Sequence, residues 1–197
     1  MSINSDKLRN PWLRAWADAN LSYASRTYAV GAPVLADVDR IVTIANMKNT
    51  TSYTIAAQPD VPRNISITHA TVAAGTDTLG TITILGTNIL DQVISEVITP
   101  SADTIVYGVK AFKTVVSAIG AGWIIAGGND TILIGVGTAL GIPIQITAAS
   151  QVLYGILGTA IIDPTVAHTD TDIAQCTVDI SSGTYNGTKK AFVVIVE

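Results

Sequence analysis

Charged residues are scarce in this chain of 197 residues. They make up 13% of the sequence, whereas roughly a quarter of the residues of an average globular domain are charged. Only two glutamates occur, Glu96 and Glu197, and no lysine or arginine lies between Lys113 and Lys189. With a formal net charge of −4, the chain offers no basic surface to a phosphate backbone, so we expect no nucleic-acid partner.

A surface with so few charges has two explanations. Interface cores are depleted of charge, so a subunit with extensive contacts to other proteins would have this composition. A robust β protein with a threonine-rich surface would have it as well. The composition by itself favours neither explanation.

The chain has a single cysteine, and we expect neither a leader segment nor a membrane-spanning apolar run. Cys176 is alone, which excludes a disulfide within the chain and fits synthesis in a reducing cytoplasm. The first twenty residues carry several charges and no apolar stretch, so we expect no signal peptide. The uncharged stretch 131–162 contains Pro143, Gln145 and Gln151, and it has no predominantly apolar window of about 20 residues. We therefore expect no membrane span.

Glycines at residues 135–141, GVGTALG, resemble a phosphate-binding loop. However, the residues after Gly141 read as another strand where a helix N-terminus is needed, and no lysine follows. We interpret this stretch as a glycine-rich hairpin connection.

His168, Asp170 and Asp172 alternate in AHTDTD, and on an extended segment they would share one face. A weak divalent site is geometrically feasible there, but a solvated loop is the favoured interpretation. His69 falls at a strand end or in a loop, and Cys176 reads as an ordinary strand thiol without a base to activate it. The sequence therefore predicts no catalytic residues, no cofactor-binding residues, no metal ligands and no enzymatic activity.

Residues 80–99, GTITILGTNILDQVISEVIT, combine two periodicities. The first half alternates like a half-buried strand, whereas Leu90, Val93, Ile94, Val97 and Ile98 in the second half are spaced as on a helix. The second half is short and rich in β-branched residues, and the GTN turn precedes it. We therefore predict a β-hairpin.

From Arg40 onward, short β-rich runs alternate with turn residues about every ten positions. This spacing favours an all-β fold, an antiparallel sandwich or barrel-like domain over residues 38–197. The predicted strands are IVTIANM, SYTIAA, NISITHA, GTITILG, QVISEVIT, TIVYGV, AFKTVVSAI, GWIIAG, TILIGVG, PIQITAA, QVLYGILGTAII, IAQCTVDI and AFVVIVE.

Residues 1–37 differ from the rest and read as an N-terminal arm. Asn10 and Pro11 favour the start of a helix of about ten residues, too short to be stable alone. The stretch that follows, ASRTYAVGAPVLADVD, reads as an extended linker. The residues predicted to bind a partner are Arg9, Trp12, Leu13, Arg14 and Trp16, an apolar face flanked by two cations.

Several motifs resemble, in order, a family of tailed-bacteriophage virion proteins. They are DVPRN at 60–64, GTN at 86–88, SEVI at 95–98, KAFK at 110–113 and GVGTALGIP at 135–143. The closing stretch 177–197, with its NGT turn, is similar to the family's last strands. The matched region begins at residue 60, so it does not include the arm.

The resemblance implies a non-enzymatic structural protein of the virion, in particular a capsid decoration or cement protein on the outer shell. Its expected partners are the major capsid protein or other virion subunits, and further copies of itself, with a trimer favoured. A tail, neck or head-fibre component is the first alternative. A carbohydrate-binding sandwich of the virion is the second, although aromatic residues, which form sugar platforms, make up only 6% of the chain.

Overall fold

The chain is described by a computed structural model over residues 25–48, 50–71, 77–125 and 128–196. These residues form an all-β protein whose sheets are antiparallel, and its helical elements are single 3-10 turns. The strands are β1 (Ser25–Gly31), β2 (Asp37–Asn46), β3 (Ser52–Tyr53), β4 (Arg63–Ala70), β5 (Thr81–Thr87), β6 (Val93–Ile98), β7 (Ile105–Phe112), β8 (Thr114–Ala121), β9 (Thr131–Gly141), β10 (Val152–Leu157), β11 (Ala160–Ile162), β12 (Thr165–Ala167), β13 (Thr177–Asp179) and β14 (Ala191–Val196). The turns are η2 (Ala149–Gln151), η3 (Ile173–Gln175) and η4 (Ser181–Gly183).

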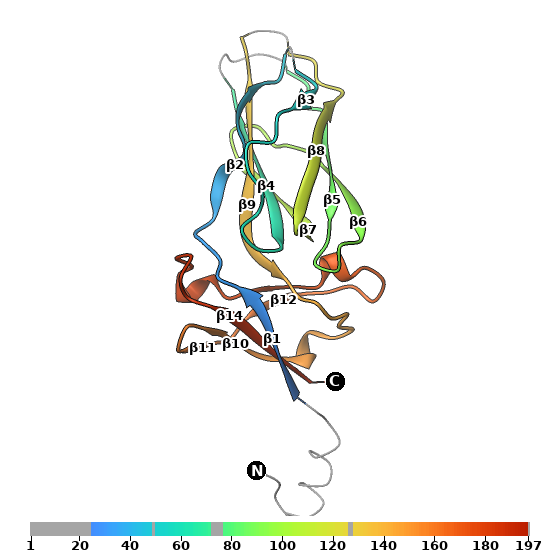
Figure 1. The fold of residues 1–197 in the computed structure, drawn as a ribbon. Coiled ribbons are helices and arrows are strands. Elements are labelled where there is room, and N and C mark those ends of the chain that lie inside the picture. Colours follow the sequence, from blue (N-terminus) through green and yellow to red (C-terminus); the bar gives the residue numbers. More distant parts are fainter. Residues whose placement is uncertain (1–24, 49, 72–76, 126–127, 197) are drawn as a thin grey trace, which may run out of the picture.

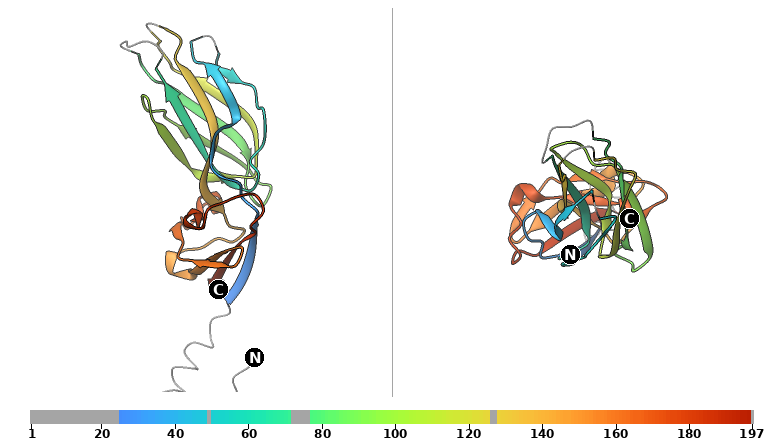
Figure 2. Two further views of the ribbon diagram at one scale, coloured as in Figure 1. Left: turned by 90° about the vertical axis from the view of Figure 1, so that its left-hand side faces the viewer. Right: turned by 90° about the horizontal axis from the view of Figure 1, so that it is seen from above.

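The molecule is elongated and consists of two stacked lobes (Figure 1). An upper lobe contains β2 to β9, and a lower lobe contains β1 and β10 to β14. Strand β9 runs from the upper lobe down into the lower one, so the two lobes share a strand. Both ends of the described chain lie in the lower lobe (Figures 1 and 2).

Two sheets curl around the core of the upper lobe. Sheet B has the order β12-β13-β9-β4-β7, with β2 also pairing with β9, and sheet C has the order β3-β8-β5-β6. Ile65, Ile84, Ile132 and Phe112, drawn from both sheets, are completely buried between them. Alternating strands with one apolar side require such a partner sheet, because each can bury only one face by itself.

The lower lobe joins segments from opposite ends of the chain. Sheet A has the order β1-β14-β10-β11, in which Ser25 of β1 pairs with Val196 of β14. Its inner face packs on β13 and on the last residues of β9, with Leu140, Val178 and Val193 completely buried. This second apolar core is separate from that of the upper lobe.

The predicted hairpin over residues 80–99 is confirmed. β5 and β6 pair in antiparallel register from Ile82–Ile98 to Thr87–Val93 without a shift. Ile82 and Ile84 face the core, as the alternation predicted, whereas Val93 and Val97 point to solvent. Val93 and Val97 lie on the outer face of β6, and Ile94 and Ile98 lie on its inner face. Their helix-like spacing is therefore a coincidence.

The linker interpretation of residues 24–39 is wrong for a part of its length. Residues 25–31 form β1, and β2 begins at Asp37. Sequence periodicity missed β1 because its partner, β14, lies at the other end of the chain. The predicted helix at residues 10–20 lies outside the described residues.

The hairpin interpretation of GVGTALG is also wrong, because all seven residues lie inside β9. A side chain at Gly135 would collide with the carbonyl oxygen of Asp37, and one at Gly137 would collide with the Asn64 amide. These glycines therefore permit close packing rather than a turn.

Two further predicted strands are not formed. Residues 143–148 form bends and irregular backbone that lead into η2, and at residues 122–125 the only pairing is an isolated bridge between Thr78 and Ile124. In both stretches, β-branched composition was mistaken for strand pairing, which depends on an available neighbour.

Candidate functional site

The five arm residues predicted to bind a partner, Arg9, Trp12, Leu13, Arg14 and Trp16, lie outside the described residues. Their role remains a prediction. The other residues that the sequence singled out, His69, His168, Asp170, Asp172 and Cys176, lie within the described ranges.

His69 lies near the end of β4 and is buried. Its Nδ1 accepts a hydrogen bond from the Asp103 backbone N–H at 3.3 Å, which requires the proton to sit on Nε2. Nε2 lies 3.1 Å from Oδ2 of Asp130, which is completely buried. Both ring nitrogens are thus used in holding the far end of the upper lobe together, and this geometry gives His69 a structural role.

The stretch with His168, Asp170 and Asp172 is a loop rather than an extended strand. Asp172 accepts a hydrogen bond at the start of η3, from the Ala174 backbone N–H at 3.0 Å, and forms an ion pair with Lys110 at 2.9 Å. Burial raises the pKa of Asp172, but these bonds outweigh it and hold the pKa below its ordinary value. Within the described ranges, no three His, Cys, Asp or Glu side chains gather where they could hold a metal ion.

Cys176 follows η3 and precedes β13, so the prediction that it lies in a strand is wrong. It is completely buried, and its Sγ lies 3.2 Å from the Gln145 amide nitrogen. A buried thiol in the lower core has no access to a substrate.

The DVPRN motif forms the junction between the lobes. Arg63 is completely buried at the start of β4, and its Nη1 donates to Asp60 at 3.0 Å and to the Val34 carbonyl at 3.1 Å. Asp60 in turn accepts from the Val34 backbone N–H at 2.7 Å. The guanidinium lies 5.7 Å from the ring centre of Tyr185, within cation–π range. One arginine thus connects β4, the segment between β1 and β2, and the segment before β14.

Tyr185 extends this network into both lobes. Its hydroxyl donates to the Thr138 carbonyl at 3.0 Å and accepts from the Ile180 backbone N–H at 3.1 Å. Burial raises the pKa of Tyr185, so the hydroxyl stays protonated. Burial also raises the pKa of Asp179, but hydrogen bonds from Thr138 and Ser181 outweigh it and leave the pKa below its ordinary value.

Asn64, the last residue of the motif, is also buried. Its amide nitrogen donates to the Gly108 carbonyl at 3.2 Å, and its amide oxygen accepts from the Ala139 backbone N–H at 3.1 Å. The side chain therefore satisfies backbone groups on both neighbours of β4, where the register shifts.

Glu96 of the SEVI motif joins sheet C to sheet B. Its carboxylate accepts from the backbone N–H groups of Val109 at 2.6 Å and Lys110 at 3.3 Å, both on β7. Burial raises the pKa of Glu96 above its ordinary value, although these two hydrogen bonds oppose the shift. A carboxylate thus replaces strand pairing where the curled sheets approach each other.

The turn of the GTN motif is built on Asn88. This buried residue accepts from the backbone N–H groups of Leu90 at 2.9 Å and Gln92 at 3.0 Å. Within the same turn, Asp91 pairs with Lys113 of the KAFK motif at 2.7 Å. The motifs therefore hold the framework together, which sequence reasoning did not anticipate because their partners are distant in the chain.

Between the lobes lies a groove of about 500 Å³. Asn88 and Gln92 of the β5–β6 turn line one side, and Gln145, Asp172 and Ile173 line the other. Asp172 is paired with Lys110, and Asn88 is occupied in its own turn. The groove thus offers amide groups and apolar side chains but no activated nucleophile.

The exposed apolar side chains are concentrated in the upper lobe. Val93, Val97, Val116 and Tyr107 each expose more than half of their surface. They lie on β6, β8 and β7 of the upper lobe (Figure 1). β6 and β8 both pair with β5, and β6 contacts β7. A monomeric protein seldom exposes a continuous apolar patch, so this region is the candidate functional surface.

Comparisons with protein-family models, curated proteins and solved structures gave no match. None of the helical turns in the described ranges is long and apolar enough to span a membrane.

Proposed function

We propose that this chain is a non-enzymatic structural protein of a bacteriophage virion. Its role is that of a capsid decoration protein, which binds the outer shell as a homo-oligomer, with a trimer favoured. The major capsid protein or other virion subunits are its partners. Function of this kind depends on contact area and not on chemistry at a few atoms.

The observation that carries the proposal is the exposed apolar surface of the upper lobe. A solvated sheet face normally alternates its buried residues with polar ones, whereas valine, leucine, isoleucine and tyrosine are exposed here. Burying such side chains against another protein stabilises the complex by roughly 25 cal/mol per Å² of apolar surface. A subunit within an assembly gains from this surface, and a free monomer does not.

The motif resemblance supplies the virion assignment. The motif residues Asp60, Arg63, Asn64 and Asn88 form internal hydrogen bonds. Because these residues stabilise the fold from inside, proteins with different exposed surfaces can share the same motifs. This use of the motifs fits a structural subunit and assigns no reaction to them.

Attachment to the shell is assigned to the N-terminal arm. Trp12, Leu13 and Trp16 would give it an apolar face, and each tryptophan can contribute roughly 2–3 kcal/mol on burial. The described chain begins at Ser25 in the lower lobe. The lower lobe is therefore proposed to face the shell, and the upper lobe to project from it.

A binding experiment tests the proposal. Purified protein is mixed with particles of the parent phage that lack it, and bound protein is measured after sedimentation as its concentration rises. Saturable binding in a fixed proportion to the capsid subunits is expected. Binding only at the neck or tail, seen by electron microscopy, would instead support the alternative of a tail, neck or head-fibre component. The elongated shape fits that alternative equally well (Figure 2).

A further inference from the structure

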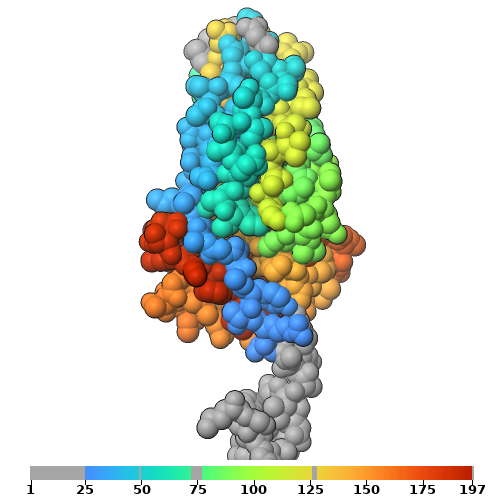
Figure 3. All heavy atoms as spheres, in the orientation of Figure 1, coloured from blue at the N-terminus to red at the C-terminus, as the bar shows by residue number. Residues whose placement is uncertain are grey.

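Sheet C has an outer face without any charged side chain. The four strands contain one charged residue, Glu96, and its carboxylate is turned to β7, where it accepts two backbone hydrogen bonds. We call the outward surface of β8, β5 and β6 the open face. In Figure 3 these strands, coloured green to yellow, form one flank of the upper lobe.

The strand register shows which residues share the open face. Thr83 of β5 lies opposite Val97 of β6 and Ile119 of β8. Ile82 and Ile84, the neighbours of Thr83, are completely buried in the core, so Thr83 and its partners point outward. Two adjacent rows therefore cross the three strands, namely Val97–Thr83–Ile119 and Ser95–Leu85–Ser117.

These rows are well exposed. Val97 exposes 63% of its surface and Ile119 exposes 47%, and Val93 at the end of β6 reaches 77%. Beyond β6, the exposed Tyr107 and Val109 of β7 continue the apolar surface. Branched apolar side chains alternating with Thr and Ser, on a pleated surface, suit packing against another sheet.

We infer that the open face packs against a second copy of this chain. A partner with a charged surface would bury its charges against the open face, where no counter-charges are available. Each such unpaired charge would lower the binding affinity. The matching surface must therefore be uncharged as well, and every other copy of the chain presents one. This inference rests on the proposed function, in which the protein is a homo-oligomer.

The position of the open face favours a neighbouring copy of the chain, and not the capsid shell, as its partner. The N-terminal end of the described chain, next to the proposed shell attachment, lies in the lower lobe, while the open face lies on the flank of the upper lobe. Copies that stand side by side on a surface would meet along such flanks. Three strands of about seven residues cover roughly 300 Å², which provides the apolar centre of an interface of about 800 Å² per partner.

The test introduces charge on the open face. In the variant Val97→Asp/Ile119→Asp, both substitutions lie at exposed positions, where we expect the fold to tolerate them. The matched control is Leu153→Asp/Ile161→Asp, at positions on sheet A of the lower lobe that are 47% and 73% exposed. Sedimentation equilibrium gives the mass of each protein, and circular dichroism verifies its folding.

We expect the wild type and the control to be oligomers, and the Val97→Asp/Ile119→Asp variant to be a folded monomer of 20.5 kDa. Its dissociation constant should rise at least about 100-fold, because each aspartate would be buried in an apolar contact. An oligomer of unchanged strength in the variant would overturn the inference. A monomeric wild type would overturn it as well.

A second pair of variants provides a test if the double substitution disturbs folding. Ser95→Cys places a thiol in the middle of the open face, and Ser101→Cys places one in an exposed loop outside it. The native Cys176 is completely buried in the lower core, so we expect the introduced thiol to be the one that reacts with a maleimide.

In the oligomer, the thiol of the Ser95→Cys variant should react at least about tenfold more slowly than that of the Ser101→Cys variant. Dilution to the monomer should remove the difference. Equal rates at high concentration would contradict the inference. If the face is protected but the protein is absent from virions, only the proposed virion role fails.

Discussion

The two lobes of this protein are built from different kinds of contact. In sheet C of the upper lobe, β5 pairs with β6 and β8, which follow it in the chain. In sheet B, β2 and β4 pair with the more distant β9. The lower lobe closes only when β1 meets β14 at the other end of the sequence. Sheet C thus joins strands that are near in the chain, whereas the pairing of β1 with β14 is a long-range contact whose loop closure costs more entropy.

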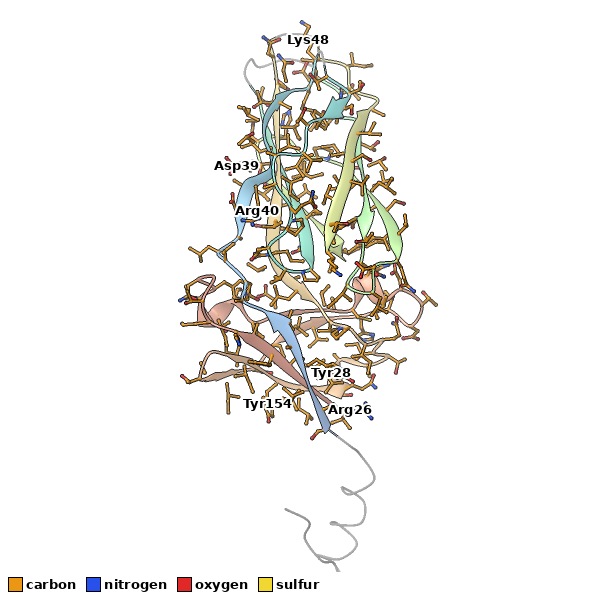
Figure 4. All side chains as sticks on the ribbon, viewed as in Figure 1. Arg26, Tyr28, Asp39, Arg40, Lys48 and Tyr154 are labelled. Carbon is orange, nitrogen blue, oxygen red and sulfur yellow. The ribbon has the colours of Figure 1, made fainter. Side chains whose placement is uncertain are left out.

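The lobes also differ in their surfaces. The upper lobe exposes apolar side chains on β6, β7 and β8, while sheet A of the lower lobe exposes fewer, chiefly Leu153 and Ile161. Figure 4 shows Lys48 at the far end of the upper lobe and Arg26, Tyr28 and Tyr154 in the lower lobe. In the proposed arrangement, lateral contacts use the upper lobe and attachment uses the lower one.

The largest effect is expected from breaking the junction between the lobes. Arg63→Met removes the buried guanidinium and leaves Asp60 without its counter-charge. Loss of one partner of a buried ion pair should lower the free energy of unfolding by about 3–5 kcal/mol. Urea denaturation measures this, with Lys48→Met at an exposed site as the control. A loss below about 1 kcal/mol would show that the junction does not depend on Arg63.

In the upper lobe, strand pairing could be predicted from the sequence where the paired strands are neighbours in the chain. Ile82 and Ile84 alternate with threonines, and the turn at Asn88 marks where the chain reverses, so the β5–β6 hairpin was predictable. β1 was not predictable, because nothing within residues 25–31 indicates a partner at residues 191–196. The glycines of β9 were misread since the close approach of Asp37 and Asn64 is a tertiary contact.

The motif residues that stabilise the fold stood out in the sequence, but their structural roles could not be predicted from it. DVPRN was visible in the sequence, but the stacking of Arg63 on Tyr185 joins residues that are far apart in the chain. His69 was correctly expected near a strand end, whereas its contact with Asp130 depends on a neighbouring loop. The exposure of Val97 and Ile119 follows from the register of three strands, which the sequence does not specify.

A smaller decrease in the free energy of unfolding is expected when Arg63 is retained and the Tyr185 hydroxyl is removed. Tyr185→Phe leaves the Ile180 N–H and the Thr138 carbonyl without their shared partner. Unsatisfied buried groups of this kind cost about 1–3 kcal/mol. Urea denaturation of this variant and of Tyr154→Phe in the same lobe provides the comparison. Equal stabilities of the two variants would exclude a role for the Tyr185 hydroxyl.

Two half-buried carboxylates, Asp179 of the lower lobe and Glu96 of the upper lobe, should contribute to the acid response in opposite directions. The pKa of Asp179 is lowered in the folded state, so its contribution is present above the ordinary value of 3.8 and is lost as the pH falls through the folded pKa. The pKa of Glu96 is raised, so folding becomes more favourable as the pH falls from the folded pKa toward 4.5.

Melting temperatures across about pH 3–7 of the wild type, Asp179→Asn and Glu96→Gln separate these contributions. The Asp179→Asn variant should lose less stability than the wild type as the pH falls below about 4, because the amide does not titrate. Glu96→Gln should remove a gain just above the ordinary glutamate pKa of 4.5. Parallel curves for all three proteins would show that neither carboxylate is linked to folding.

The smallest effect on stability is expected from removal of the arm. Deleting residues 2–20 should leave the melting temperature within a few degrees of the full chain, because the predicted helix is too short to be stable without a receiving surface. The truncated protein should no longer bind particles. A fall of many degrees with binding retained would show that the arm closes one end of its own fold.

The amount of this protein in purified virions gives a direct test of its proposed role on the capsid. Isotope-labelled reference peptides allow its copies to be counted by mass spectrometry relative to the major capsid protein. We predict a constant ratio to the capsid subunits in every preparation, as for a protein that covers the shell. Absence of the protein from purified virions would contradict the account.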